Sequence, residues 1–536
     1  MRRGAEARWH ELAGLSLLPW VWLFFFYQGT VAVPALADKP APDPDRGREI
    51  FRRGVDADGK DIQAAMGPEG VEVPASLLPC ASCHGHDGRG RPEGGISPSN
   101  LTWEALTKPY GVRHEGGREH PPYDEASLRR AITMGVDSAG NPLNSTMPQY
   151  RLSRRDADDL VAYLKLLGRE QDPGLSEDSL RIGTVLPSQG PFGDPVLRTL
   201  EAFFDELNEK GGIYGRRIEL SAVHLTSGSR DTEAEIQEIR QALEENAPFA
   251  LVAPSMALRE EALAALLEEW ALPTVGPFAT EPWLEFPPNR YVFYLYPGLE
   301  EQVRALVAFA EARLDKEERR LLVVHSGGSE TNYLVEAVRE QARLGGWVAV
   351  EMEITGQREP KSSHLATSRT QPSAVMLLDS RVTIAQLLAS REEESWDPFI
   401  LIPGSFAGPS LFAAPAAFRG EIFAAFPVLP GDTTPAAYQS YRELAQRIGL
   451  ESTQVSPQLS ALSAARLLVE ALQRAGRKVS REKMLEELEG LYQFGTGFTP
   501  PVSYNPNRRL GVLGAHIVTV DPAEGRFVSV GKRVVP

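Results

Sequence analysis

The sequence predicts a multidomain protein in which a small, loop-rich unit is followed by a bilobal α/β unit. The sequence pattern changes near residue 180. Before it the chain is rich in Gly, Pro, His and Arg, and after it the pattern is that of alternating strands and helices. That alternation runs through the chain twice, which indicates two lobes. With 536 residues the chain is also too long for a single core, because domains usually hold about 100–200 residues.

The charge of the chain excludes one class of partner. The formal net charge is −16, from 72 acidic and 56 basic residues. Nucleic-acid binding requires a concentrated basic surface, so we expect no nucleic-acid partner. With 42% hydrophobic and 24% charged residues the composition is that of an ordinary globular protein.

The N-terminus has the features of an export signal. Arg2, Arg3 and Arg8 precede an apolar run over 12–33, and the small residues of Ala35-Leu-Ala37 follow it. This order is typical of a signal peptide over 1–37. The run is long enough to remain as an N-terminal membrane anchor, so both outcomes stay open. In either case we expect the bulk of the chain in the periplasm, with membrane contact only through this segment if it is uncleaved.

Proline-rich and polar stretches divide the rest of the chain. A linker is expected over 38–45 and a second over 171–179. They bound a first domain over 46–170, which closes with an amphipathic helix at 154–167. The second domain then extends over 180–536.

The second domain alternates strands with helices, which predicts parallel sheets covered by helices on both faces and a cleft between two lobes. For the first lobe we expect strands at 181–186, 217–223, 249–253 and 274–278, and helices at 195–210, 231–246 and 260–270. The pattern restarts with strands at 320–325, 348–354, 375–378 and 399–402, and a helix at 333–344.

The motif Cys80-Ala-Ser-Cys83-His84 predicts one covalently attached haem c. Two thiols at this spacing add to the two vinyl groups of one porphyrin, and the next residue presents an imidazole to the iron. The chain has only two cysteines and nine histidines, so chance placement in this order is improbable. A dithiol or half of a zinc site is the competing interpretation, but it lacks a second pair of ligands.

The sixth iron ligand is open between two methionines, a histidine and no protein ligand. Met147 stands in a proline-stiffened loop and is favoured, because a thioether ligand raises the reduction potential. Met134 is the rival, although its helix-like surroundings favour a packing role. His86, His114 and His120 lie in Gly- and Pro-rich loops, and we expect them at the surface.

The first domain resembles a monohaem class I cytochrome c. The resemblance is carried by residues 47–51 (GREIF), 80–90 (CASCHGHDGRG) and 128–163. It implies a small all-α fold, electron transfer, and His84 and Met147 as axial ligands. The segment 54–79 departs from a minimal cytochrome, and its role cannot be assigned from the sequence.

The second domain resembles the type I periplasmic binding proteins of the leucine/isoleucine/valine-binding group, the substrate-binding family of ABC transporters. The matching stretches are 181–193 (RIGTVLPSQGPFG), 203–220, 249–255 and 273–280. The resemblance implies two Rossmann-like lobes, three crossings between them, and a ligand carboxylate held at Ser255, Phe278 and Thr280. A helix N-terminus after Ser255 would favour an anion, although plain capping explains these hydroxyls equally well.

The second lobe departs from the amino-acid-binding pattern of this group. The aromatic residue of the family falls near Glu330, and its ammonium-binding acid falls near Gly404 and Ser405. Together with Phe278, Phe406 would make the pocket more apolar. We therefore expect a small solute other than an amino acid, such as a carboxylate, an alcohol or an aromatic.

We expect an electron-transfer and ligand-binding protein and no enzyme, since the sequence holds no G-x-S-x-G, H-E-x-x-H or P-loop motif. The favoured function is one-electron transfer coupled to solute binding, with a periplasmic dehydrogenase or a terminal oxidase as redox partner. One alternative is the substrate-binding component of an ABC importer, with an ABC permease as partner and the haem as redox sensor. Another is a docking scaffold without a ligand.

Overall fold

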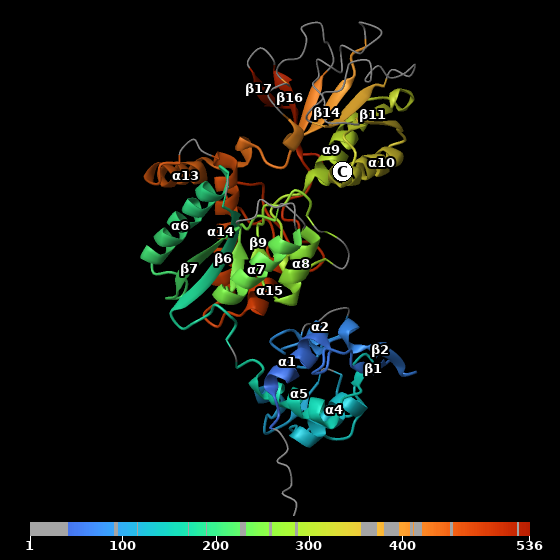
Figure 1. Cartoon of the computed structure of the whole chain (residues 1–536), viewed down its shortest axis with the longest axis vertical. Helices are drawn as coiled ribbons and strands as arrows, with labels where there is room; N and C mark the ends of the chain where they lie inside the picture. Colours follow the sequence, from blue (N-terminus) through green and yellow to red (C-terminus); the bar gives the residue numbers. More distant parts are fainter. Residues whose placement is uncertain are drawn as a thin grey trace, which may run out of the picture.

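The computed structural model describes residues 41–536 apart from 91–94, 115, 170, 189, 226–231, 257–259, 283, 285–287, 355–371, 380–395, 408–410, 412–420, 451–453 and 522–524. The predicted signal peptide or anchor over 1–37 lies outside the described residues. Three bodies follow one another along the long axis: an N-terminal domain, a first lobe and a second lobe (Figure 1). Among the described helices, none is long and apolar enough to cross a membrane.

Two crossing helices form the frame of the N-terminal domain. Helix α1 (Pro44–Arg53) packs against α5 (Arg154–Leu166), with Phe51 and Tyr163 in ring contact at 5.5 Å. The backbones approach closely at Gly47, where a Cβ atom would lie 2.1 Å from the carbonyl oxygen of Asp159. Three further α-helices of the described residues belong to the domain: α2 (Cys80–His84), α3 (Trp103–Leu106) and α4 (Glu125–Met134).

The segment without an assigned role forms a small antiparallel sheet. Strands β1 (Gln63–Met66) and β2 (Val71–Pro74) make a hairpin, and β5 (Gln149–Tyr150) joins its other edge. A one-turn helix, η1 (Ala75–Leu77), leads from the hairpin to α2. A second short hairpin consists of β3 (Val112–Arg113) and β4 (Glu119–His120).

The first lobe is a parallel five-stranded sheet in the order β10-β9-β8-β6-β7. Its strands are β6 (Ser179–Pro187), β7 (Arg217–Leu225), β8 (Ala250–Val252), β9 (Thr274–Val275) and β10 (Val292–Phe293). Local helices are α6 (Gly193–Glu209), α7 (Thr232–Asn246) and α8 (Glu260–Glu269). Helices from much later in the chain complete the lobe: α13 (Pro435–Arg447), α14 (Val455–Ala475) and α15 (Arg481–Glu489). The apolar face of α14 lies in the same core as β8 and α6.

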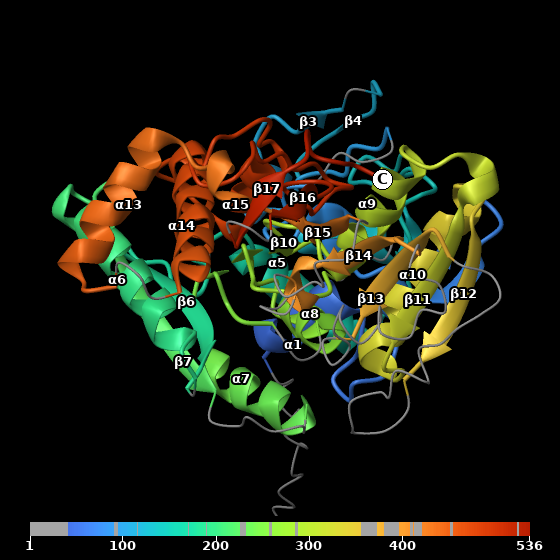
Figure 2. The same ribbon diagram turned by 90° about the horizontal axis from the view of Figure 1, so that it is seen from above.

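The second lobe has a seven-stranded sheet in the order β12-β11-β13-β14-β15-β16-β17, which Figure 2 shows from above. Five strands are parallel: β11 (Arg320–His325), β12 (Val348–Glu353), β13 (Ala374–Leu378), β14 (Phe399–Pro403) and β15 (Ile422–Phe426). The last two, β16 (His516–Asp521) and β17 (Arg526–Ser529), are antiparallel. Helices α9 (Leu299–Glu311) and α10 (Ser329–Leu344) pack together beside this sheet.

Three chain segments join the two lobes. The first leads from β10 to α9, the second from β15 through η5 (Pro430–Asp432) to α13, and the third runs back to β16. The first and third crossings pair with each other at Tyr294 and Leu510. This gives the chain the two Rossmann-like lobes and the three crossings that the resemblance implies.

Most predicted elements of the second domain agree with the structure, and the strand expected at 320–325 agrees residue for residue. The strand expected at 274–278 was too long, because it ends at Val275. Gly276 then adopts φ 62°, and a Cβ atom there would lie 2.5 Å from the side chain of Ala464 on α14. The close approach of α14 therefore ends this strand, and a local pattern does not show it.

The crossing of α1 and α5 gives a prediction for stability. Gly47→Ala should destabilise the N-terminal domain by about 1–3 kcal/mol, because the added methyl group meets backbone atoms that cannot rotate away. Hydrogen exchange of the α1 and α5 amides measures the change. Gly116→Ala is the matched control, since a Cβ atom there has no neighbour within 4 Å. Equal protection in the two variants would contradict the close packing.

Candidate functional site

The haem-attachment motif occupies one helical turn. Helix α2 starts after Pro79 and ends at Gly85, whose φ of 74° terminates the turn. The i,i+3 spacing places Cys80 and Cys83 on the same face. Cys80 is buried and Cys83 is exposed. Their thiol sulfurs stand in for thioether sulfurs, and burial raises the pKa of the Cys80 thiol to about 11.

His84 is held in the tautomer that an iron ligand needs. Its Nδ1 atom lies 2.8 Å from the backbone oxygen of Ser99, and a carbonyl can only accept. The proton therefore sits on Nδ1, which leaves the lone pair of Nε2 for a metal. The imidazole is only 7% exposed, and this burial lowers its pKa and keeps it neutral. These residues fit a covalently held haem.

Met147 lies in a tight turn beside the core of the N-terminal domain. Its backbone N–H donates to the oxygen of Asn144 at 2.9 Å, and the Asn144 side chain accepts from Thr146. The Met147 side chain is half-buried against the cluster that contains Cys80. Met134, at the end of α4, is 61% exposed. The packing role expected for Met134 is therefore wrong, because its position on α4 points away from the core.

The hairpin β1–β2 contacts the chain on both sides of Met147. Gly67 donates to the backbone oxygen of Ser145 at 3.2 Å, and Ala64 pairs with Tyr150. The Tyr150 hydroxyl donates to the oxygen of Leu78 at 2.7 Å, two residues before α2. The inserted segment therefore connects the Met147 loop with the start of the haem-attachment helix.

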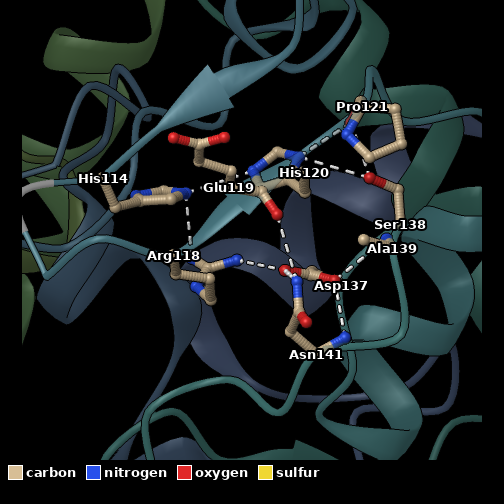
Figure 3. A network of polar contacts seen from close by, with 9 residues as sticks. All are labelled: His114, Arg118, Glu119, His120, Pro121, Asp137, Ser138, Ala139 and Asn141. Atoms are coloured by element: carbon tan, nitrogen blue, oxygen red, sulfur yellow. Dashed lines mark hydrogen bonds and ion pairs between the residues drawn. The ribbon is translucent and has the colours of Figure 1, made fainter.

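Two of the three loop histidines, the buried His120 and the half-buried His114, belong to a network of polar contacts instead of lying free at the surface (Figure 3). His120 is only 8% exposed, and its Nε2 atom lies 3.1 Å from Nε2 of His114. Arg118 donates to His114 at 2.9 Å and pairs with the fully buried Asp137 at 2.8 Å. Desolvation, then the charges of Arg118 and His120, lower the pKa of His114. The surface expectation was wrong because these contacts join segments up to 19 residues apart.

His86 is also not a free surface residue. Its ring is half-buried and lies 6.1 Å from that of Tyr291 in the first lobe. Burial, followed by the charges of Arg52, Arg290 and Arg481, lowers the pKa of His86 to about 3. The ring is therefore neutral at physiological pH.

The structure brings Ser255 and Phe278 together at the carboxyl ends of β8 and β9. The two residues form a parallel bridge, in which Phe278 donates to the oxygen of Pro254 at 2.8 Å. Both are half-buried, whereas Thr280 is exposed and accepts through its backbone oxygen from Leu299 of the first crossing at 3.0 Å. In parallel sheets ligands bind outside these ends of the strands. Helix α8 begins five positions after Ser255, and residues 257–259 between them lie outside the description.

Sequence reasoning missed three residues at the carboxyl ends of the strands. Phe192 follows β6 and packs edge-to-face on Phe278, with ring centroids 4.8 Å apart. In the second lobe, His325 ends β11 and Asp379 follows β13, and both are buried. The available signal was that Asp379 directly follows the strand predicted at 375–378 and that His325 ends the strand predicted at 320–325.

At Gly404 the second lobe has no side chain that could pair with an ammonium group. Glu330 lies in the first turn of α10, and its side chain is outside the description. Gly404 begins the short helix η3 (Gly404–Phe406), where a Cβ atom would lie 2.7 Å from the backbone oxygen of Ala425. Phe406 packs partly into the core of its own lobe.

Comparison with known proteins decides the family. A family model described as periplasmic binding protein matches residues 179–525. The chain belongs to the periplasmic binding protein family. A second model, cytochrome c, matches residues 75–168, so this periplasmic binding protein carries a cytochrome c domain as its N-terminal domain. The cytochrome c family consists of electron carriers, and the periplasmic binding protein family consists of solute-binding proteins. No curated protein matches the chain.

Solved structures share the fold of the solute-binding part. A branched-chain amino acid ABC transporter protein from Thermus thermophilus with bound valine has 19% identity and a TM-score of 0.53, covering 67% of this chain and 97% of its own. A fatty acid ABC transporter substrate-binding protein from Thermomonospora curvata has 19% identity and a TM-score of 0.52, covering 68% and 95%. A substrate-binding protein from Aeropyrum pernix has 17% identity and a TM-score of 0.52, covering 67% and 96%. At these identities the likeness shows the fold alone.

The two methionines give a spectroscopic prediction. If Met147 is the sixth ligand, the oxidised protein shows the weak near-infrared band of sulfur bound to ferric iron, and Met147→Ala erases it. Met134→Ala is the control: it should keep the band and change the free energy of unfolding by no more than about 0.5 kcal/mol, because the side chain is exposed. A band lost with Met134 and kept without Met147 would move the ligand to Met134.

Proposed function

We propose that this periplasmic binding protein is exported and transfers single electrons through one haem c, coupled to the binding of a small solute in its cleft. The observation that carries the proposal is the fixed imidazole of His84, whose Nε2 lone pair is left for iron beside two attachment cysteines. When bound, the haem supplies reversible one-electron exchange. Cys80 and Cys83 hold it covalently, and His84 and Met147 set its potential as axial ligands.

The number of haems follows from the cysteines. A c-type haem uses two thiols, and the sequence contains only Cys80 and Cys83. Export follows from the residue pattern of 1–37 and from the chemistry of haem attachment outside the cytoplasm. We therefore place the protein in the periplasm, with the signal either cleaved or kept as an anchor.

Replacement of both cysteines tests the haem assignment. The double variant Cys80→Ala/Cys83→Ala should contain no haem that survives denaturation and acid–organic extraction, since no thioether can form. Haem staining of denatured protein measures this. Each single variant is the matched comparison and should keep at most one thioether bond. Covalent haem in the double variant would refute the attachment site.

We propose a carboxylate without an ammonium group as the solute. Ser255 and Phe278 meet at the carboxyl ends of the strands, and Phe192 adds a second ring, so a small polar contact adjoins an apolar wall. The relatives named for valine and for fatty acids show that this fold accepts both kinds of ligand in other proteins. The absence of an acid at Gly404 favours the second kind here.

A pair of ligands that differ by one group tests this proposal. Leucine should bind no more tightly than about 0.1 mM, since burying an unpaired ammonium costs several kcal/mol. The compound 4-methylpentanoate, which lacks only that group, should bind more tightly. Isothermal titration calorimetry on the full chain compares them. Micromolar leucine binding would overturn the proposal, and loss of that binding in Asp379→Asn would identify the acid responsible.

The redox partner belongs to the same proposal. A periplasmic dehydrogenase whose substrate or product occupies the cleft would make solute recognition and electron transfer serve one pathway, and a terminal oxidase is the other candidate partner. The alternative is an importer component with an ABC permease as partner and the haem as redox sensor. Its support is that the structural relatives are named as ABC transporter proteins.

A further inference from the structure

The segment between the two domains is bound to the first lobe instead of hanging free. The Asp172 carboxylate accepts from the backbone N–H of Arg481 at 2.7 Å, at the start of α15. The backbone oxygen of Ser176 accepts from the Arg216 side chain at 2.8 Å. At Gly174 the chain adopts φ 75° and approaches the first lobe so closely that a Cβ atom would lie 2.4 Å from the nitrogen of Phe249. These contacts fix the point from which the N-terminal domain extends.

The loop after the haem motif makes a second contact with the first lobe. His86 packs its ring edge-to-face on Tyr291, with the ring centroids 6.1 Å apart, and the Glu482 carboxylate lies close to the backbone of His86. Glu482 is itself paired with Arg290, and the exposed fractions of their side chains are only 9% and 18%. An edge-to-face ring contact fixes the relative orientation of the two rings, which a contact between solvated charges does not.

Charges from both domains gather around this contact. The charges of Arg52 on α1 and of Arg290 and Arg481 in the first lobe act on His86 and lower its pKa. The Arg481 guanidinium donates to four backbone oxygens of the first lobe: that of Pro248 at 2.6 Å, those of Phe249 and Trp270 at 3.0 Å each, and that of Ala271 at 3.3 Å. Arg481 is therefore fixed in place while its backbone holds the linker. Because Arg290 and Arg481 are held by partners within the first lobe, the surface that receives the His86 loop is fixed by the first lobe itself.

The contact between His86 and Tyr291 lies next to the segments that join the two lobes. Tyr291 directly precedes β10, from which the first crossing leaves for the second lobe. Arg509, on the third crossing, donates to the oxygen of Asn289 at 3.1 Å and pairs with Glu489 of α15 at 2.7 Å. The loop that follows the iron ligand therefore contacts the base from which two crossings start.

We propose that the N-terminal domain docks on the first lobe at His86, Tyr291 and Glu482 and moves with that lobe as one body. The partner of this surface is the protein's own first lobe. Closure of the cleft then moves the second lobe relative to a fixed pair of haem domain and first lobe.

Variants of one helix test the docking in the haem-loaded full chain. Glu482→Ala removes the partner of Arg290, whose guanidinium lies over the Tyr291 ring, while alanine suits helix α15. Glu487→Ala is the matched control on the same helix. Small-angle X-ray scattering should fit one domain arrangement for wild type and control, and a wider distribution for Glu482→Ala. Trypsin cleavage after Arg169, followed by haem staining, should accelerate about tenfold only in Glu482→Ala, because cleavage follows local opening.

Two results would overturn the proposal. One is wild-type scattering that requires many orientations of the N-terminal domain. The other is a folded Glu482→Ala protein with wild-type scattering and wild-type cleavage. If Glu482→Ala loses the far-UV circular dichroism of the first lobe, His86→Ala takes its place with the same expected results, since it changes only the N-terminal domain. His224→Ala, an exposed histidine of β7, is then the control.

Discussion

A short ladder of backbone hydrogen bonds joins the first and third crossings between the lobes. The arrangement of the two lobes and the position of the proposed docking surface both depend on it. Tyr294 donates to Arg509, Gly511 donates to Tyr294, and Val512 donates to the oxygen of Leu295, all at 2.9–3.1 Å. The Tyr504 hydroxyl adds a further bond to the oxygen of Tyr294 at 3.1 Å. Because main-chain bonds of this kind survive small rotations of the lobes, the ladder can act as an axis. The contact with the N-terminal domain lies next to it, because Tyr291 precedes Tyr294 by three residues.

The N-terminal domain combines a minimal electron carrier with two additions. Helices α1 and α5 pack against each other in its core, and the carbonyl of Ser99 orients His84. The β1–β2 hairpin restrains the loop of the proposed sixth ligand. The network around His120 and Asp137 holds the β3–β4 hairpin against the segment that follows α4. Additional constraints on a haem pocket are useful where the ligand is a weak thioether, because a mobile loop would let it dissociate.

Sequence reasoning succeeded where the chemistry or the period is local. The spacing of Cys80, Cys83 and His84 is dictated by the porphyrin, and the apolar run at 320–325 shows a buried strand without reference to its neighbours. It failed where distant segments meet: α14 ends β9 early at Gly276, and His120 is buried by groups that follow it by almost 20 residues. The ligand-binding role of Ser255, Phe278 and Thr280 stays a prediction, although two of them lie together. Asp379 was missed because a buried acid after a strand carries no spacing rule.

The order of segments along the chain has a consequence for biogenesis. The N-terminal domain is one continuous stretch, whereas each lobe is completed by residues from the last hundred or so positions: α14 and α15 for the first, β16 and β17 for the second. During vectorial export the N-terminal domain can therefore fold as soon as it emerges, while both lobes must wait for the end of the chain. Haem ligation would precede completion of the lobes, and the surface on which His86 docks would form last. A protein truncated after β15 would then be a mature cytochrome attached to an unfolded tail.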